Sequence, residues 1–392
     1  MMKLCLVAGA RPNFVKIAPI VEAINYYRHS HNKGIEYYLV HTGQHYDEKM
    51  SKLFFNDLGI PPSDIDLEVG SASHAIQTAE IMKRFEKVCL KEKPTHVLVV
   101  GDVNSTIACA LVASKLGIKV VHVEAGLRSF DRDMPEEINR VLTDAISDFL
   151  FITEENAREN LRNEGIPENK IYFAGNVMID TLLKHKQKAL KSEILNTLGL
   201  LNDSPTEKSH LITDYCVLTI HRPSNVDDKT TFQGIIEALT EISQQIPIII
   251  PVHPRTLNRI NEFGFADSFI WHSNPESPFK ISTTGIYCID PLGYLDFLQL
   301  TSHAKIVLTD SGGIQEETTI LGIPCVTLRE NTERPITVTQ GTNVIAGIKK
   351  ENIIKATFSQ LALFKEPVKP SVPPLWDGKA SNRIVEILAG EA

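Results

Sequence analysis

Residues 305–322, KIVLTDSGGIQEETTILG, join an apolar run to paired glycines and paired acids. Gly312 and Gly313 would let the backbone approach a ligand, and the N-terminus of the helix expected after them directs N–H groups and partial positive charge at the same place. This pattern suits a phosphate or diphosphate, although two glycines can also form a tight turn. Glu317, one turn into that helix, could accept hydrogen bonds from a neutral diol such as ribose.

Two cations follow the first apolar run, in GARPNFVKIAP. Arg11 comes directly after the expected strand and Lys16 lies in the next helix, near an N-terminus that already favours an anion. The alternative is a solvated pair of cations at a helix start. The chain has no GxGxxG motif, so the sequence gives no support to a nicotinamide dinucleotide.

Acids stand at two further strand ends, because Asp102 closes THVLVVGD and Glu124 closes KVVHVE. A third acid, Glu136, follows Pro135 at the start of a helix and has Arg140 four residues later, on the same side. Each of them alone could be a helix cap or a surface ion pair. Three such acids in one domain favour a cluster that transfers protons.

Histidines end two strands of the second half, His221 in VLTIHRPSNVD and His253 in IIIPVHPRT. Arg222 and Arg255 lie beside them, but no HxH, HExxH or Cys/His spacing accompanies either, so no metal site is expected. We interpret His221 as a ligand or acid and His253 as structural. Arg334, after the last strong strand, could reach the diphosphate.

The candidate residues can act together only if strands of a sheet bring them to one edge. Short apolar runs alternate with amphipathic helical patterns along the chain, which is typical of stacked βαβ units. In EEINRVLTDAISDF a 3.6-residue spacing predicts an apolar helix face made of Ile138, Val141, Leu142, Ala145, Ile146 and Phe149. The polar segment 202–210 indicates a surface loop.

At 392 residues the chain is longer than a single hydrophobic core usually supports, so two doubly wound, Rossmann-like α/β domains facing a cleft are expected. We predict domains over 1–180 and 181–374, with a helix at about 375–392 returning to the first.

Composition excludes several partners. The formal charge is -8 and there is no basic tract, which argues against nucleic acid and anionic membranes. No apolar run approaches the roughly 20 residues that a membrane span needs. The 6 cysteines are scattered, without CxxC, as expected of reduced thiols in the cytoplasm.

Taken together, the blocks GARPNFVKIAP, HTGQHYD, GDVNST, HVEAGLRS, MPEEINRVLTD, HR, PVHPRT, DSGGIQEE and ERPITVTQGTN resemble the non-hydrolysing UDP-N-acetylglucosamine 2-epimerase family. The resemblance runs from residue 3 to about 350, and ASNRIVEIL resembles the family's final helix. It implies a glycosyltransferase-B-like fold, a homodimer, and interconversion of UDP-GlcNAc with UDP-ManNAc for surface polysaccharides. No metal or organic cofactor is implied.

The resemblance also carries roles to individual residues. Acid and base residues would be Asp102, Glu124, Glu136 and His221. Contacts to the nucleotide would come from Arg11, Lys16, Arg140, Phe297, Ser311, Gly312, Gly313, Glu317 and Arg334. Among these, Phe297 would flank the uracil and Glu317 would hold the ribose.

This chain departs from the family pattern at two places. Many members have a second arginine and a glutamate after the histidine, where this chain has Arg222, Pro223 and Ser224. Asp47 replaces a glutamine that in several bacterial members helps to bind a second, activating UDP-GlcNAc. Two segments also resemble those of sister enzymes that act on a diacetamido uronic acid nucleotide, namely GDVNST and RSFDRDMPEEINR. A hydrolysing epimerase, a glycosyltransferase and a non-catalytic UDP-sugar sensor are further alternatives.

Overall fold

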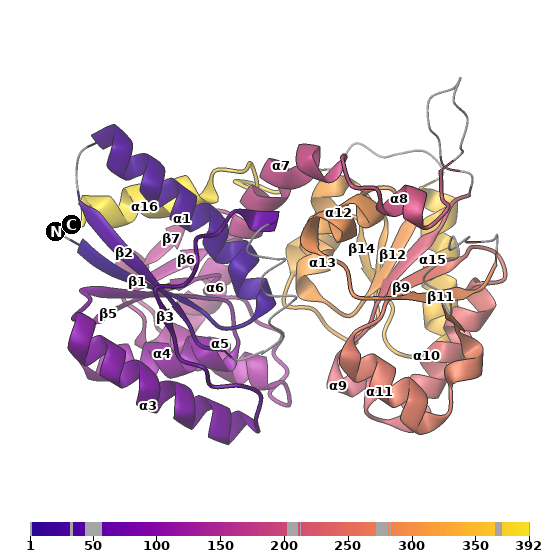
Figure 1. The fold of residues 1–392 in the computed structure, drawn as a ribbon, viewed down its shortest axis with the longest axis horizontal. Coiled ribbons are helices and arrows are strands. Elements are labelled where there is room, and N and C mark those ends of the chain that lie inside the picture. The colour runs from indigo at the N-terminus through magenta and orange to yellow at the C-terminus, as the bar shows by residue number, and fades with distance from the viewer. Residues whose placement is uncertain are drawn as a thin grey trace. The chain divides into compact units, whose positions relative to one another are not determined.

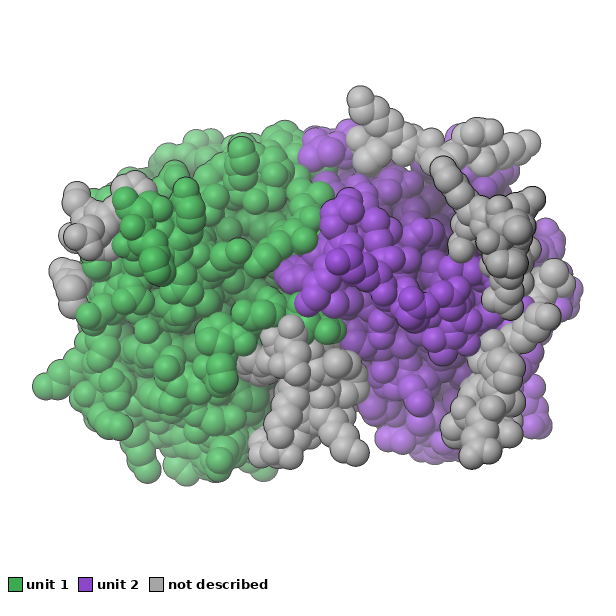
Figure 2. Space-filling model, turned by 45° about the horizontal axis from the view of Figure 1, so that its top comes forward, with its two compact units in different colours: residues 1–184, 373–392 green, residues 185–372 purple. Residues whose placement is uncertain are grey.

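The computed structural model describes residues 2–31, 34–43, 57–201, 211, 213–271, 281, 284–364 and 371–391, without the side chains of Arg11 and His31. The chain forms two compact units (Figure 2), unit 1 with residues 1–184 and 373–392 and unit 2 with residues 185–372. The division between them falls inside one helix, α7 (Val177–Ala189). In the described ranges, no helix is both long and apolar enough to cross a bilayer.

Unit 1 is built on a parallel sheet with the strand order β3-β2-β1-β4-β5-β6-β7 (Figure 1). The central strands are near-continuous apolar runs because helices cover both faces of a parallel sheet. The order reverses direction between β1 and β4, which is the point where doubly wound sheets bind ligands. The strands are β1 (Met2–Ala8), β2 (Ile35–His41), β3 (Ile65–Asp66), β4 (His96–Val100), β5 (Lys119–Val123), β6 (Phe149–Ile152) and β7 (Ile171–Phe173).

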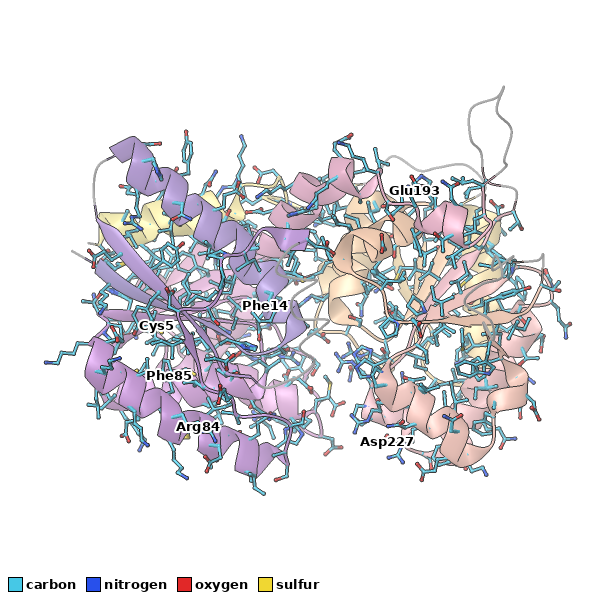
Figure 3. The ribbon with its side chains drawn as sticks, in the orientation of Figure 1. Cys5, Phe14, Arg84, Phe85, Glu193 and Asp227 are labelled. Atoms are coloured by element: carbon cyan, nitrogen blue, oxygen red, sulfur yellow. The ribbon has the colours of Figure 1, made fainter. Side chains whose placement is uncertain are left out.

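Helices cover both faces of this sheet, with α1 and α16 on one and α3, α4 and α5 on the other (Figure 1). Cys5 on β1 and Phe85 on α3 belong to one buried cluster that joins the sheet to the second set of helices (Figure 3). The helices are α1 (Arg11–His31), α3 (His74–Glu92), α4 (Asn104–Lys115), α5 (Pro135–Ile146), α6 (Glu155–Asn163) and α16 (Ala380–Gly390).

The C-terminal segment completes unit 1. The carboxylate of Asp180, on α7, accepts hydrogen bonds from the backbone N–H groups of Ala380 (3.1 Å) and Ser381 (2.7 Å), and so caps the first turn of α16. The indole N–H of Trp376, the largest fully buried side chain, donates to the carbonyl of Thr153 at 2.9 Å. These contacts fix residues 373–391 on the first domain's helices.

Unit 2 repeats the plan with a second parallel sheet, in the order β10-β11-β9-β8-β12-β13-β14. Its direction reverses between β8 and β12, which pair in register from Cys216 opposite Ile306 to Thr219 opposite Thr309. The strands are β8 (Cys216–Thr219), β9 (Ile248–Pro251), β10 (Ile270–Trp271), β11 (Ile286–Ile289), β12 (Ile306–Thr309), β13 (Cys325–Thr327) and β14 (Asn343–Ile345).

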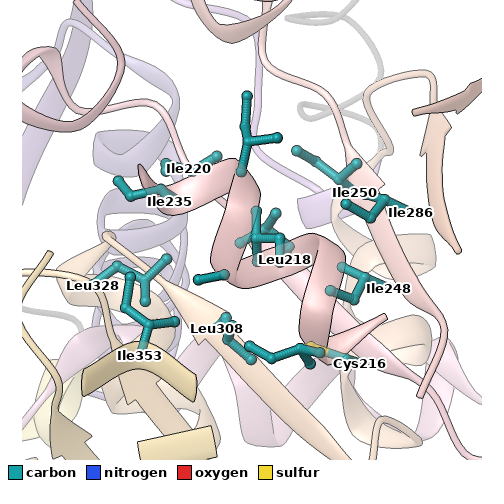
Figure 4. Packing of buried hydrophobic residues seen from close by; sticks show 14 of the residues in the cluster. Cys216, Leu218, Ile220, Ile235, Ile248, Ile250, Ile286, Leu308, Leu328 and Ile353 are labelled. Atoms are coloured by element: carbon teal, nitrogen blue, oxygen red, sulfur yellow. The ribbon is translucent and has the colours of Figure 1, made fainter. Parts of the chain in front are cut away.

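Alternate residues of each strand in unit 2 serve different cores. Leu218, Ile248 and Leu308 pack under α10 in one cluster (Figure 4), whereas Val217 and Ile249 belong to a cluster on the opposite face. The helices are α8 (Ile194–Thr197), α9 (Pro223–Val226), α10 (Lys229–Ile242), α11 (Pro254–Phe263), α12 (Tyr294–Ser302), α13 (Gly312–Leu321), α14 (Pro335–Thr339) and α15 (Lys350–Leu363).

The predicted fold class, two doubly wound Rossmann-like α/β domains, is confirmed. Three strands were not expected from the sequence, β3, β10 and β14, all of them two or three residues long at sheet edges. Such short runs are too brief to show a period. The predicted loop at 202–210 lies outside the described residues, as does Asp47.

Candidate functional site

In unit 1, two of the predicted acids, Asp102 and Glu124, follow the neighbouring strands β4 and β5, and the other predicted residues lie on α1 and α5. Val100 of β4 pairs in register with Val123 of β5, so Glu124 follows its strand beside Gly101, and Asp102 comes next. Glu124 has a left-handed backbone, with φ 74°. This conformation is uncommon for a residue with a side chain and is concentrated at functional sites. Unit 1 therefore brings Asp102 and Glu124 to one edge.

Lys16 and Glu124 form a buried ion pair, and the exposed fractions of their side chains are only 7% and 2%. Gly101 makes room for it, because a Cβ there would lie 2.9 Å from Lys16 Nζ, and its φ of 66° also favours glycine. Desolvating two charges generally offsets their attraction, so a pair of this kind contributes little net stability. A role at the site explains its presence better than a role in folding.

Asn13, which sequence reasoning missed, ties the start of α1 to the end of β4. Its Oδ1 accepts hydrogen bonds from the N–H groups of Gly9 (3.1 Å) and Ala10 (2.9 Å), and its Nδ2 donates to the carbonyl of Val100 (3.0 Å). The side chain thus spans the two strands between which the sheet order reverses. It fixes the turn from which Lys16 reaches Glu124.

Arg140 links Asp102 to the first turn of α5. Its Nη1 lies 2.5 Å from Asp102 Oδ2, while its Nε and Nη2 donate to Glu137 Oε2 at 3.0 and 2.8 Å. The Glu137 carboxylate also accepts from the backbone N–H groups of Ser129 and Phe130, both at 3.0 Å. Burial opposes ionisation of Glu137, but these amides and Arg140 outweigh it and hold its pKa below the ordinary value.

The expected partner of Arg140 was Glu136, and the structure differs on this point. Glu136 is partly exposed at the start of α5, and the neighbouring buried acid, Glu137, holds the guanidinium instead. A spacing of three residues brings two side chains together on a helix as well as a spacing of four. Sequence spacing alone could not separate two adjacent acids.

The apolar residues predicted for one face of α5 do not all pack on the core: Ile146 does, and Phe149 lies beyond the helix, in β6. Ile138 and Leu142 are exposed by 43% and 49%, whereas the buried residues of α5 are Glu137, Arg140, Thr143 and Asp144. The helix therefore buries a polar face against the strand ends. This arrangement follows from charge, since the buried face is needed to hold Asp102, His122 and Arg128.

A second layer of charge lies below the acids, centred on the fully buried Asp144. Its Oδ1 lies 2.6 Å from His122 Nδ1, and its Oδ2 accepts from the N–H of Gly126 at 2.9 Å and pairs with Arg128 Nη2 at 2.7 Å. Burial raises the pKa of Asp144, but His122, Arg128 and the amide together lower it below the ordinary value. The other ring nitrogen of His122 lies 2.9 Å from the carbonyl of Gly101, next to Asp102.

In unit 2, His221 and the segment Asp310–Gly313 follow β8 and β12, the adjacent strands at the sheet's reversal. Asp310 is fully buried, and its Oδ1 lies 3.0 Å from His221 Nδ1. Its Oδ2 accepts from the backbone N–H groups of His221 and Arg222, both at 2.8 Å. Burial opposes ionisation of Asp310, yet His221 and these amides lower its pKa. His221 and the two glycines are thus brought to one place.

Ser311 is the N-cap residue of α13, and the helix begins at Gly312. The backbone N–H of Ser311 donates to Thr309 Oγ1 at 3.0 Å, which ties the turn to β12. A Cβ on Gly312 would lie 2.5 Å from Glu333 Oε1, so the buried Glu333 requires a glycine there. The first glycine is therefore needed for packing as well as for an open helix start.

The paired acids of α13 have separate surroundings. Glu316 is fully buried and its Oε1 lies 2.7 Å from Arg334 Nε, so Arg334 is held by an acid rather than projecting from the loop. Glu317 contacts the hydroxyl of Tyr294 at 3.4 Å. Burial raises the pKa of Glu317 to about 7; the contact with Tyr294 opposes this rise and the charge of Glu316 adds to it.

The remaining predicted residues have these places. Phe297 is a partly buried residue of α12, packed against the cluster that holds Val217 and Ile249. Arg11 is the first residue of α1, but its side chain lies outside the described part of the chain. His253 caps α11, since its Nδ1 accepts from the N–H of Arg255 at 3.2 Å, which fits a structural role.

Two doubly wound domains, each with charged side chains at the reversal of its sheet, define a glycosyltransferase-B-like fold. The family model for UDP-N-acetylglucosamine 2-epimerase matches residues 28–389. The UDP-N-acetylglucosamine 2-epimerase of Methanocaldococcus jannaschii is 45% identical over 389 residues, which cover 99% of each chain. The chain belongs to the UDP-N-acetylglucosamine 2-epimerase family.

Two further comparisons concern ligands. The crystal structure of the Methanocaldococcus jannaschii enzyme in complex with UDP-GlcNAc and UDP matches with a TM-score of 0.86 and 44% identity, covering 99% of this chain and 100% of that one. The UDP-2,3-diacetamido-2,3-dideoxy-D-glucuronate 2-epimerase of Pseudomonas aeruginosa is 39% identical over 391 residues, 99% of each chain. Relatives of both kinds thus share the whole length of the chain.

The two neighbouring acids of α5 can be separated by experiment. Glu137→Gln should lower the free energy of unfolding by about 3 kcal/mol, because it leaves the buried Arg140 with only the more exposed of its two charged partners, Asp102. Glu136→Gln is the matched control and should change stability by less than about 0.5 kcal/mol. Urea unfolding followed by circular dichroism measures both. Equal stability of the two variants would contradict the assignment of Glu137 as the structural acid.

Proposed function

We propose that this chain is a UDP-N-acetylglucosamine 2-epimerase, which interconverts UDP-GlcNAc and UDP-ManNAc in the cytoplasm for surface polysaccharide biosynthesis. The observation that carries the proposal is the pair of acids, Asp102 and Glu124, at neighbouring strand ends, each next to a cation. The bound UDP-GlcNAc and UDP in the related crystal structure support the same substrate here. All six cysteines are buried and free, as suits a reducing compartment.

The chemistry of the substrate favours elimination over simple deprotonation. The C2 proton of a hexosamine has no neighbouring carbonyl to stabilise a carbanion. If a base removes that proton while the C1–O bond breaks, the C–H electron pair becomes the C1–C2 double bond and the C–O pair leaves with the UDP oxygen. Returning a proton to the opposite face of C2, and UDP to C1, inverts C2 alone.

This route needs proton-transfer groups at both faces of C2. The proposed acids and bases are Asp102, Glu124 and Glu136, which divide the proton transfers at the two faces of C2 among them. Lys16 and Arg140 each hold one carboxylate before substrate binds. They can also contact the anionic substrate, because its negative charge competes with the acids for the same cations.

The departing diphosphate needs a preorganised electropositive seat. We assign this seat to His221 and to Ser311, Gly312 and Gly313, where α13 begins. Arg11 and Arg334 are proposed to add positive charge. Phe297 is proposed to flank the uracil and Glu317 to accept hydrogen bonds from the ribose hydroxyls.

A second substrate is possible on the same mechanism. The Pseudomonas aeruginosa relative is named for a UDP-diacetamido uronic acid, and it matches this chain over nearly its full length. Elimination and re-addition would proceed at C2 of that sugar in the same way. The two substrates therefore differ in recognition and not in the reaction.

The first prediction concerns the reaction. In D2O, proton NMR should show deuterium at C2 in both UDP-ManNAc and recovered UDP-GlcNAc, because the base exchanges its proton with solvent before the reverse step. The UDP-diacetamido uronic acid is assayed in a parallel reaction, and the substrate with the higher rate of epimerisation is the physiological one. Asp102→Asn is the control and should lose about 100- to 10,000-fold in kcat. Full epimerisation without deuterium at C2 would rule out the mechanism.

The second prediction concerns pH. Because the pKa of Glu317 is about 7, its carboxylate is ionised above this pH and protonated below it. Protonation removes an acceptor for the ribose diol, so UDP-GlcNAc should bind about tenfold more weakly at pH 6 than at pH 8. Calorimetry on the inactive Asp102→Asn variant measures this, since UDP-GlcNAc carries no phosphate that titrates in this range. Glu317→Gln should remove the difference, and equal affinities of the Glu317 protein at both pH values would contradict the role.

We also propose that the enzyme is a homodimer that associates through exposed apolar residues on α5 and directly after α4. The outward residues of α5 include Ile138 and Leu142, and Leu116 is exposed directly after α4. Nine of the 12 residues of α4 are buried, so the exposed apolar surface comes from α5 and from Leu116. A second copy of the chain offers the same apolar surface, as a two-fold interface requires.

The dimer proposal predicts a change of mass. Light scattering after gel filtration should give a dimer for the unmodified chain and a monomer for the double variant Ile138→Asp/Leu142→Asp, because each aspartate would be buried without a partner. Leu363→Asp, at an apolar residue of α15 exposed by 73%, is the matched control and should leave the dimer intact. A monomeric unmodified chain, or a dimeric double variant, would contradict the proposal.

A further inference from the structure

Asp310 is a fully enclosed acid beside a proposed functional group of unit 2. Its side chain is fully buried at the end of β12, and both oxygens face groups from the loop after β8. Besides the N–H groups of His221 and Arg222, Oδ2 accepts from Asn225 Nδ2 at 3.2 Å. Arg222 also donates from Nε to the Asp310 carbonyl at 2.8 Å. The acid therefore holds the whole turn that carries His221.

The other carboxylate oxygen of Asp310, Oδ1, determines which ring nitrogen of His221 carries the proton. Oδ1 lies 3.0 Å from Nδ1, and an ionised carboxylate only accepts hydrogen bonds. A proton at Nδ1 is therefore favoured, and Nε2 becomes the nitrogen that can face a ligand. Histidine in water prefers the opposite neutral tautomer, so this choice is imposed by the protein. The His221 side chain is 41% exposed.

The other charged groups around His221 are few among the described residues. The ring of His253 lies 5.4 Å away, centroid to centroid, at an angle of 39°. His253 Nδ1 is occupied by the N–H of Arg255, whose guanidinium pairs with Asp227 at 3.3 Å. Arg222 Nη2 lies 3.6 Å from Glu333. Asp310 is thus the acid that contacts the His221 ring directly.

We propose that Asp310 is a positioning residue that fixes His221 with its proton at Nδ1 and Nε2 toward the substrate diphosphate. This inference rests on the proposed function, in which His221 stabilises departing UDP. When the C1–O bond breaks, its electron pair goes to the diphosphate oxygen, and the protonated ring donates a hydrogen bond to that oxygen from Nε2. The carboxylate of Asp310 stabilises the positive ring without taking its proton. No net proton transfer to UDP is needed, because the released diphosphate stays an anion.

The substitution Asp310→Asn is a sharp test of this role, since an asparagine side chain has nearly the same shape as aspartate. Its amide oxygen could still accept from the backbone N–H groups of His221 and Arg222, while its NH2 group would face Nδ1 of the histidine. An amide donor there requires a lone pair at Nδ1 and moves the proton to Nε2. Asp310→Asn thus keeps the turn and inverts the neutral tautomer. A neutral ring could still donate from Nε2, but it would lack the positive charge that the Asp310 carboxylate stabilises and that the departing diphosphate requires.

The first experiment needs neither substrate nor activity. The protein is labelled with 15N in its 13 histidines, and the His221 signal is assigned by its loss in His221→Gln. Neutral His221 should show a protonated Nδ1 and an unprotonated Nε2. A neutral ring protonated at Nε2 instead of Nδ1 would overturn the proposal, whatever the fate of any variant. Because this measurement uses no substrate, it can succeed or fail independently of the proposed epimerase activity.

The second experiment measures turnover of UDP-GlcNAc. Asp310→Asn should lower kcat at least 100-fold and change KM less than threefold, because the acid acts through His221 on the transition state. The alkaline limb of its kcat profile should move to lower pH, since a neutral amide does not stabilise a positive ring. Asp227→Asn, which removes an acid from the Arg255 and Arg259 pairs of the same unit, is the matched control and should change neither. An Asp310→Asn variant with the His221 tautomer or the pH profile of the unmodified enzyme would refute the positioning role.

Discussion

In both units, the structure at the strand ends depends on a fully buried aspartate. Its carboxylate contacts a histidine ring and accepts hydrogen bonds from backbone N–H groups of a neighbouring loop. Asp144 does this in unit 1 with His122 and Gly126, and Asp310 does it in unit 2 with His221 and Arg222. Each acid comes from a different element than the loop that it holds. The loops at these strand ends can therefore be rigid without regular structure of their own, and the side chains that they carry are held in place with them.

The charged residues of unit 1 are balanced against each other before any ligand binds. Glu124 faces Lys16, and Asp102 shares Arg140 with Glu137. Ion pairs of this kind contribute little to folding, because desolvation offsets the attraction. A substrate that brings negative charge would draw the cations away from the acids. Carboxylates released in this way become better acceptors for a proton, which would couple binding to the start of the reaction.

The sequence was sufficient for the plan of the fold and for most strand ends. Runs such as THVLVVGD and KIVLTD predict buried parallel strands because the residues in them are mostly apolar until the end, and β4 and β12 lie there. The acids at those ends could be identified by position alone. The short edge strands could not, since β3 and β10 have two residues each and their pairing depends on neighbours distant in the chain.

The details of the site depended on tertiary contacts that spacing does not encode. Glu136 and Glu137 are equivalent in sequence, and only the position of Arg140 shows which one is buried. The apolar period of α5 indicated an inward face, but the charged residues on the other side have partners at the strand ends, and two of the apolar residues are exposed. Asp310 gave no sign of a role, since its partner in space is 89 residues away.

The path of the C-terminal segment has a consequence for biosynthesis. Unit 1 includes residues 373–391, which leave the ribosome only after the whole of unit 2 has been made. Until then, the Thr153 carbonyl lacks the indole of Trp376 and the carboxylate of Asp180 lacks the amides of α16. During translation, the first half of the chain therefore waits in an incomplete state while the second domain is synthesised, and its final closure comes with the last helix.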